Sequence, residues 1–200
     1  MKLGLENILK ELKPYRKRKV KVDPEQAALL VIDMQNFFRG MVRPILKDVL
    51  RVIETCRKKD VPIVFTQHGH TEPRADGGAL GQWWGEVILH GTADWEFLPE
   101  MKVESKDKII HKKRYSAFFE TDLERFLRSK GIRDLVISGV MTNLCCETTA
   151  RDGFMRDYRA FFLIDGTATR KDEHHLATLK NLGFGFASLT TCDELVRMCT

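Results

Sequence analysis

The stretch Ala27-Ala28-Leu29-Leu30-Val31-Ile32-Asp33 decides the fold, because six apolar side chains follow one another without a polar interruption and end at a carboxylate. A strand with one face in water alternates apolar and polar side chains, whereas a strand covered on both faces is apolar throughout. Residues 27–32 therefore predict a strand inside a parallel sheet. Asp33 is expected at the carboxyl end of that strand, at the edge of the sheet.

Five shorter segments of the same apolar kind follow, and helical patterns separate most of them. The predicted strands are residues 27–32, 62–66, 108–111, 135–138, 160–164 and 186–189. The predicted helices are residues 43–60, 121–131, 143–158 and 172–182, with a further turn of helix from residue 191. Strands that alternate with helices favour an α/β fold with a doubly wound parallel sheet. The sequence therefore predicts a three-layer α-β-α domain with a six-stranded, parallel, Rossmann-like sheet.

Residues 68–107 do not divide into strand and helix units. An excursion of this length between two strands of a compact domain is more often functional than accidental. It contains all three tryptophans of the chain, Trp83, Trp84 and Trp95. We therefore expect it to lie over a cleft and to supply part of a binding site.

The positive charge of the chain is concentrated at its start. The 200 residues carry a formal net charge of +5. Residues 1–21 contain eight Lys/Arg and two Asp/Glu side chains, so residues 22–200 are close to neutral. We therefore divide the chain into a basic N-terminal helical arm, residues 1–21, and one domain, residues 22–200. A nucleic-acid-binding domain usually spreads its basic side chains over the folded body, so nucleic acid is not expected as a partner.

Other features of the composition indicate a soluble protein of a reducing compartment. No apolar run approaches the roughly 18 residues that span a bilayer, so no membrane partner is expected. The first residues lack the layout of a signal peptide. The five cysteines include no Cys-x-x-Cys pair, and their odd number argues against a disulfide framework. We therefore expect a cytoplasmic location and a free cysteine that is available as a nucleophile.

The candidate site lies at the carboxyl ends of the predicted strands, where parallel α/β sheets bind their ligands. The residues that follow these strands are Asp33, residues 66–70, 111–113 and 139–146, and Asp165. They combine carboxylates, lysines and paired cysteines at one edge of the sheet. Neither Gly-x-Gly-x-x-Gly nor Gly-x-x-x-x-Gly-Lys occurs in the sequence, which argues against a nucleotide-binding enzyme.

Three of these segments resemble the signature blocks of the isochorismatase-like cysteine hydrolases. The segments are Leu29-Leu30-Val31-Ile32-Asp33-Met34-Gln35-Asn36-x-Phe38, Lys112-x-Arg114-Tyr115-Ser116-Ala117-Phe118 and Gly139-Val140-Met141-Thr142-Asn143-Leu144-Cys145. They occur in the order and spacing of the family, and the resemblance extends from about residue 24 to residue 194. Trp83-Trp84 and residues 141–151 are most similar to plant-type nicotinamidases and streptothricin-hydrolase-like amidases.

The resemblance implies a catalytic triad of Asp33, Lys112 and Cys145. It also implies a cis peptide bond between Val140 and Met141, beside backbone N–H groups that stabilise an oxyanion. Cys145 follows a strand-to-helix junction, so we expect the helix dipole and the Lys112 ammonium to lower the pKa of its thiol. Asp33 is expected to take the thiol proton and to return it to the departing amine.

Several neighbouring residues are expected to have structural roles only. Strand alternation allows either Lys112 or Lys113 to face the site, but not both. Cys146 lies one helical step of about 100° from Cys145, so the two thiols point in different directions. The register of the motif assigns Lys112 and Cys145 to the site and leaves Cys146 for packing. His174-His175 is expected on the surface of a helix.

Aromatic side chains near the triad are the candidate walls of a substrate pocket. We expect Phe38, His70, Trp83, Trp84 and Tyr115 to line it, because clustered aromatic rings suit a flat or aromatic substrate. The alternative for each tryptophan is an ordinary place in the core.

The histidines after the second strand raise the question of a metal. Metal-binding nicotinamidases carry an Asp-x-His pair there, where this sequence has His68-Gly69-His70. We therefore expect no cofactor and turnover without a stoichiometric metal. The alternative is that His68 and His70 bind zinc or iron, with His90 or His111 as a third ligand.

We interpret the protein as a cysteine hydrolase that cleaves the C–N bond of a small amide through a thioester acyl-enzyme, in the manner of nicotinamidases. Two alternatives stay open. One is an isochorismatase-type vinyl-ether hydrolase, which needs a proton from the aspartate but no nucleophile. The other is a catalytically silent family member that serves as a binding module. The fold does not fix the acyl group, so the sequence does not identify the small-molecule substrate.

The sequence of the N-terminal arm also leads us to expect a homo-oligomer. Leu5, Ile8, Leu9 and Leu12 form one apolar stripe of a helix, which must be buried somewhere. Relatives commonly form dimers or tetramers, so we expect a homo-oligomer in which the arm contacts a partner subunit and its basic run faces acidic groups there. The alternative is that the stripe folds back onto its own chain.

Overall fold

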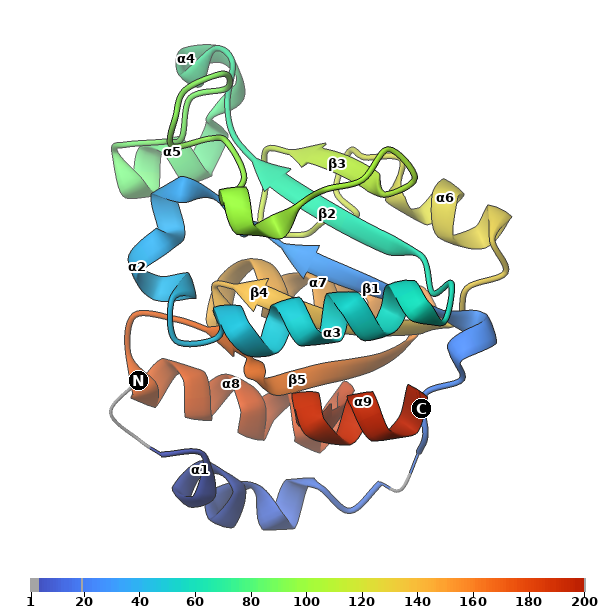
Figure 1. Ribbon diagram of the computed structural model, residues 1–200. Coiled ribbons are helices and arrows are strands. Elements are labelled where there is room, and N and C mark those ends of the chain that lie inside the picture. Colours follow the sequence, from blue (N-terminus) through green and yellow to red (C-terminus); the bar gives the residue numbers. More distant parts are fainter. Residues whose placement is uncertain (1–3, 19, 200) are drawn as a thin grey trace.

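The computed structural model describes residues 4–18 and 20–199 and shows a three-layer α-β-α domain (Figure 1). The central sheet has the strand order β3-β2-β1-β4-β5-β6, and each neighbouring pair is parallel. The strands are β1 (Ala27–Ile32), β2 (Ile63–His68), β3 (Lys108–Lys112), β4 (Asp134–Val140), β5 (Arg159–Ala168) and β6 (Ala187–Thr190). The six-stranded parallel sheet predicted from the sequence is therefore confirmed.

Helices cover both faces of the sheet. They are α1 (Leu5–Leu12), α2 (Arg39–Val42), α3 (Leu46–Lys58), α4 (Pro73–Asp76), α5 (Gly78–Trp84), α6 (Leu123–Ser129), α7 (Glu147–Met155), α8 (Asp172–Gly185) and α9 (Cys192–Cys199). Side chains of α3 and α9 pack in one core cluster, and side chains of α1, α6, α7 and α8 pack in the other. Within the described residues, no helix has the length and hydropathy needed to cross a membrane.

The burial of the strands explains their sequences. All six residues of β1 are buried, because β1 lies between β2 and β4 and has helices on both sides. β3 is an edge strand, and its burial alternates. Ile110 and Lys112 are buried, whereas Ile109 and His111 are exposed. This alternation points Lys112 into the molecule.

The part of the excursion that contains α4 and α5 lies beyond the carboxyl ends of β1 and β2, and the rest runs back beside the sheet to the start of β3 (Figure 1). The excursion between β2 and β3 contains α4, α5 and a 3-10 turn, Pro99–Met101. Gln35 fastens it, because its buried side-chain amide donates to the carbonyl of His68 at 2.9 Å and to the carbonyl of Trp95 at 2.7 Å. Its Oε1 also accepts from the N–H of His68 at 2.8 Å. One side chain that follows β1 thus holds both the end of β2 and the returning loop.

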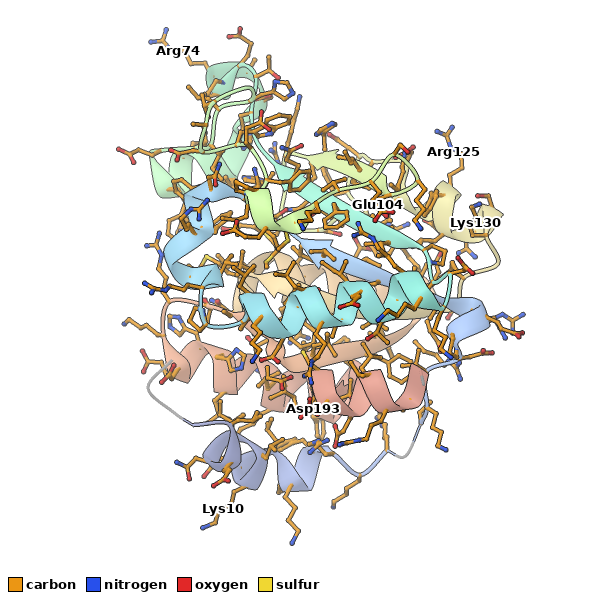
Figure 2. The ribbon with its side chains drawn as sticks, viewed as in Figure 1. Lys10, Arg74, Glu104, Arg125, Lys130 and Asp193 are labelled. Carbon is orange, nitrogen blue, oxygen red and sulfur yellow. The ribbon has the colours of Figure 1, made fainter. Side chains whose placement is uncertain are left out.

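The N-terminal arm packs against its own chain. Ile8 and Leu12 of α1 are buried in the core cluster that includes residues of α8. Lys10 projects away from the body (Figure 2). The guanidinium of Arg16 contacts both carboxylate oxygens of Glu194, at 2.6 and 2.5 Å. Ile8 and Leu12 of the stripe and Arg16 of the basic run therefore fold back onto the same chain, which is the alternative, because α8 and α9 supply the apolar face and the acidic group. Lys19 of the basic run lies outside the described residues, and the contact of the arm with a partner subunit stays a prediction.

We predict that Leu12→Ala lowers the free energy of unfolding by about 2–4 kcal/mol, because it leaves a cavity at a fully buried site. Leu5→Ala is the matched control. Leu5 is 39% exposed, so its loss is expected to cost less than about 1 kcal/mol. Urea denaturation measures both values. Equal values for the two variants would contradict the docking of the arm on the body.

Gly139 brings the end of β4 against β1. Its φ is +108°, and a Cβ at this position would lie 2.1 Å from the carbonyl oxygen of Ile32. Only glycine allows both this backbone conformation and this approach. The residue therefore sets the distance between the strand that ends at Asp33 and the turn that carries Cys145.

We predict that Gly139→Ala destabilises the protein by more than about 2 kcal/mol, because the methyl group meets backbone that has no room to move. Gly185→Ala is the matched control, since no atom lies within 4 Å of its added Cβ. Its expected change is within about 0.5 kcal/mol. Chemical denaturation compares the two variants, and similar stabilities would refute the close approach of β4 to β1.

Candidate active site

Three side chains from three different strand ends meet at one edge of the sheet. Asp33 directly follows β1, and Lys112 is the last residue of β3. Cys145 lies in the single π-helical turn Thr142–Cys146 that follows β4. Nζ of Lys112 lies 2.8 Å from Oδ2 of Asp33, and both side chains are fully buried. The Cys145 thiol lies close enough to both side chains for them to act on its pKa.

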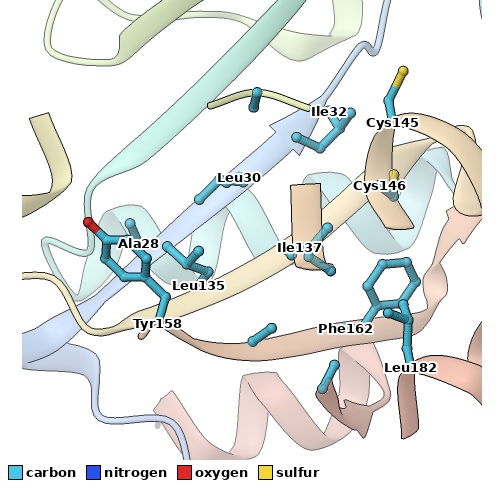
Figure 3. Packing of buried hydrophobic residues seen from close by; sticks show 14 of the residues in the cluster. Ala28, Leu30, Ile32, Leu135, Ile137, Cys145, Cys146, Tyr158, Phe162 and Leu182 are labelled. Carbon is cyan, nitrogen blue, oxygen red and sulfur yellow. The ribbon is translucent and has the colours of Figure 1, made fainter. Parts of the chain in front are cut away.

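Cys146 and Lys113, which are next in sequence to Cys145 and Lys112, point away from the site, as the register of the motif predicts. Cys146 is fully buried, and its thiol points to the carbonyl of Ser138 at 4.0 Å. Figure 3 shows Cys146 beside the apolar residues of the core, with the sulfur of Cys145 directed away from them. Lys113 is exposed, and its Nζ lies 3.1 Å from Oδ2 of Asp76.

The electrostatics of the site differ from the expectation for the thiol. Burial raises the pKa of the Cys145 thiol to about 12, although the Lys112 charge acts in the opposite direction. Burial by itself would lower the pKa of Lys112, but the charge of the Asp33 carboxylate outweighs burial and the pKa is raised. The expected lowering of the thiol pKa is therefore wrong. Desolvation dominates, and the lysine charge is already paired with Asp33.

These two pKa shifts determine the protonation of Lys112 and Cys145 at neutral pH. Lys112 stays an ammonium, and Cys145 stays a thiol until a base removes its proton. The Asp33 carboxylate is paired with Lys112 and acts on the pKa of the Cys145 thiol, so Asp33 is the candidate base for the thiol proton.

The turn that carries Cys145 has the backbone implied by the family resemblance. The peptide bond between Val140 and Met141 is cis. Met141 lines the cavity described below, whereas Val140 is buried. The carbonyl of Met141 accepts the N–H groups of Leu144 at 3.1 Å and Cys146 at 3.2 Å, which closes the turn.

A cavity of about 290 Å³ opens in front of Cys145. Among the predicted pocket residues, Phe38, Trp84 and Tyr115 line it. Nε1 of Trp84 donates to the hydroxyl of Tyr115 at 2.7 Å, which joins two of these walls. The cavity is thus lined mainly by aromatic and aliphatic side chains, with Cys145 at its inner end.

Two of the predicted pocket residues lie outside this cavity. Trp83 is 81% exposed and lines a neighbouring apolar groove, because α5 turns it away from Cys145. His70 is fully buried behind the wall, and its Nδ1 lies 3.0 Å from Oδ1 of Asp76. His68 takes the place expected for His70, since it lines the cavity next to Cys145.

Sequence reasoning missed other cavity residues, among them Leu144 and Arg170. Arg170 was missed because the predicted fifth strand ends too early. β5 continues to Ala168, so the residues at the sheet edge are those that follow it. Asp165, which was expected at the edge, accepts the backbone N–H of Cys192 at 2.7 Å and thereby supports the start of α9.

His68 and His70 lie next to each other at the end of β2, and no third ligand is grouped with them among the described residues. Nδ1 of His68 and Nε2 of His70 are buried without a hydrogen-bond partner, and the ring centroids are 5.2 Å apart. A catalytic zinc takes three protein ligands. The Asp76 carboxylate beside His70 also contacts Lys113 and the N–H of Thr71. Among the residues that the structure describes, no three His, Cys, Asp or Glu side chains are grouped to hold an ion.

His175 is not on the surface, which corrects the expectation for His174-His175. It is 1% exposed, and its Nδ1 lies 2.9 Å from Oγ1 of Thr142 in the turn that carries Cys145. Burial lowers the pKa of His175 to about 4, so its ring is neutral at physiological pH. His174 is exposed. The difference arises because α8 packs one of its faces against the Cys145 turn.

Comparison with known proteins agrees with this geometry. The model of the isochorismatase domain family matches residues 27–194. Nicotinamidase 3 of Arabidopsis thaliana is 50% identical in an alignment of 186 positions that covers 92% of this chain and 93% of that protein. Ureidoacrylate amidohydrolase RutB of Caulobacter segnis is 31% identical in an alignment of 210 positions that covers 88% of this chain and 88% of that protein.

Solved structures show the same fold. A cysteine hydrolase from Pseudomonas syringae pv. phaseolicola has a TM-score of 0.86 at 25% identity, over 90% of this chain and 95% of that chain. N-carbamoylsarcosine amidase from Thermoplasma acidophilum has a TM-score of 0.76 at 28% identity, over 84% and 98% of the two chains. This protein belongs to the isochorismatase-like hydrolase family.

Proposed function

We propose that this protein is a nicotinamidase-like amidase, which hydrolyses a small carboxamide to a carboxylic acid and ammonia. The observation that carries the proposal is the contact of the Cys145 thiol with the buried Asp33–Lys112 ion pair at the inner end of an aromatic cavity. The name of the relative that is 50% identical supports an amide substrate.

In the first half of the reaction, Asp33 takes the proton of Cys145 as the sulfur bonds to the carbonyl carbon of the amide. The carbonyl π electrons move to oxygen, and backbone N–H groups of the Met141–Cys145 turn stabilise the oxyanion. When the oxyanion collapses, the C–N bond breaks and Asp33 returns its proton to the leaving nitrogen. Ammonia departs and a thioester with Cys145 remains.

In the second half, a water molecule replaces the ammonia. Asp33 takes a proton from this water as its oxygen bonds to the thioester carbon. The C–S bond then breaks, the carboxylic acid leaves, and Cys145 regains a proton. Lys112 stays charged throughout and keeps the Asp33 carboxylate paired inside the protein.

The shape and walls of the cavity support a planar aromatic carboxamide as the substrate. Phe38, Trp84 and Tyr115 offer ring faces and edges to a flat molecule. His68 adds a polar group beside them. Burial, with the nearby Lys112 charge, lowers the pKa of His68 to about 3, so it is neutral and can exchange a hydrogen bond with a ring atom of the substrate.

Three finer points stay predictions from the sequence. They are turnover without a stoichiometric metal, a cytoplasmic location, and assembly into a dimer or tetramer. Because Ile8, Leu12 and Arg16 contact their own chain, the prediction of an oligomer depends mainly on the nearly neutral charge of residues 22–200 and on the habit of relatives.

We predict that Cys145→Ala abolishes release of ammonia from nicotinamide, whereas Cys146→Ala keeps at least about a third of the activity. Only the thiol of Cys145 reaches the cavity. The assay is a panel of nicotinamide, pyrazinamide and ureido acids, with isochorismate alongside. Turnover of isochorismate alone would favour the vinyl-ether reaction, and no turnover of any compound would favour the silent binding module. Retained amide turnover in Cys145→Ala would refute the role of this residue.

We predict that His68→Phe lowers kcat/KM for nicotinamide by about three- to tenfold, the effect of one neutral hydrogen bond. Benzamide lacks the ring nitrogen and is the matched control substrate, so its kcat/KM should change much less. Both values come from the same ammonia assay. An equal fall for the two amides would mean that His68 shapes the cavity and does not recognise the ring.

A further inference from the structure

The hydroxyl of Thr66 holds Asp33 at two points. Thr66 lies on β2 beside the end of β1 and is fully buried. Its Oγ1 donates to Oδ1 of Asp33 at 2.5 Å and accepts the backbone N–H of Asp33 at 3.1 Å. The hydroxyl therefore contacts both the main chain and the carboxylate of the same residue.

Asp33 needs such support because its backbone is in an uncommon conformation. Its φ is 49°, in the left-handed region that non-glycine residues seldom adopt. A residue of this kind persists only where surrounding contacts determine its conformation. The hydrogen bond from the Asp33 N–H to Thr66 is one of these contacts.

The two carboxylate oxygens of Asp33 have different partners. Oδ1 accepts from Thr66, and Oδ2 lies 2.8 Å from the ammonium of Lys112. Without the first contact, the carboxylate could rotate about its Cβ–Cγ bond and turn both oxygens toward the lysine. With both contacts made, the plane of the carboxylate is fixed, and so is its position relative to the Cys145 thiol.

We propose that Thr66 is a positioning residue that orients the Asp33 carboxylate for proton transfer from Cys145. This inference rests on the proposed role of Asp33 as the proton acceptor. Thr66 does not line the cavity, so it acts through Asp33 and not on the substrate. Misplacing a catalytic group by about 1 Å can cost on the order of a hundredfold in rate.

The test separates the hydroxyl from the shape of the side chain. Thr66→Val keeps the shape and removes the hydroxyl, whereas Thr66→Ser keeps the hydroxyl and removes a methyl group. We expect Thr66→Val to lower kcat for nicotinamide by at least about tenfold with KM within about twofold, and Thr66→Ser to recover kcat to within about threefold of the parent. Thr66→Ala is carried in parallel in case valine prevents folding.

Thr167→Val is the matched control. Thr167 is also a fully buried strand residue, but its hydroxyl donates to the carbonyl of Leu163 in its own strand at 2.9 Å. Its removal is expected to leave kcat within about twofold. A loss in Thr66→Ser that equals or exceeds the loss in Thr66→Val would mean that packing matters and would overturn the proposal.

A second measurement does not depend on the substrate. The rate of alkylation of Cys145 by iodoacetamide at pH 7, followed by mass spectrometry, reports removal of the thiol proton. Thr66→Val should slow this rate at least about fivefold in the parent, but change it less than twofold when Asp33→Asn is already present. Equal slowing in both backgrounds would show that Thr66 does not act through Asp33. If no amide is hydrolysed, this cycle still decides the role of Thr66 while the proposed function fails.

Discussion

The buried ion pair between Asp33 and Lys112 is the interaction on which the rest of the site depends. Both side chains are fully buried, and their charged atoms are 2.8 Å apart. Transfer of two charges out of water costs several kcal/mol each, and mutual attraction offsets this only with good geometry. The pair spans β1 and β3, which are separated by β2, so all three strand ends must keep their relative positions. Much of the surrounding structure can be understood as support for this geometry.

Three other residues keep the ends of β1, β2 and β4 in place around the ion pair. Thr66 of β2 lies between the two charged residues in the sheet order and bonds to Asp33. Gln35 ties the end of β2 to the loop that covers the site. Gly139 brings β4, and with it the Cys145 turn, against the last residue of β1. These contacts are short, buried and made mainly by small or neutral side chains, so they fix the charges without adding new ones.

Burial of the site also raises the pKa of the Cys145 thiol. A thiol at a helix start beside a lysine is expected to ionise readily, yet the pKa of Cys145 is raised to about 12 because desolvation outweighs the Lys112 charge. Removal of the thiol proton therefore requires a base near the sulfur, and Asp33 is the base that we propose. A low-dielectric site makes an uncompensated thiolate costly, so proton transfer and bond formation to the substrate belong to one step.

The sequence by itself determined the parallel sheet, because uninterrupted apolar runs such as 27–32 are stable only where both faces are covered. It also placed Asp33, Lys112 and Cys145 at one edge, because parallel strands bring their carboxyl ends together. Only the tertiary structure decided the rest. Trp83 and His70 lie outside the cavity and His68 lines it, since the path of α4 and α5 depends on anchors such as Gln35 that leave no periodic signal. His175 is buried and Leu12 is covered by its own chain, because burial depends on which element packs nearby. The thiol pKa also follows from burial, which is a property of the packed molecule and not of the neighbours of Cys145 in the sequence.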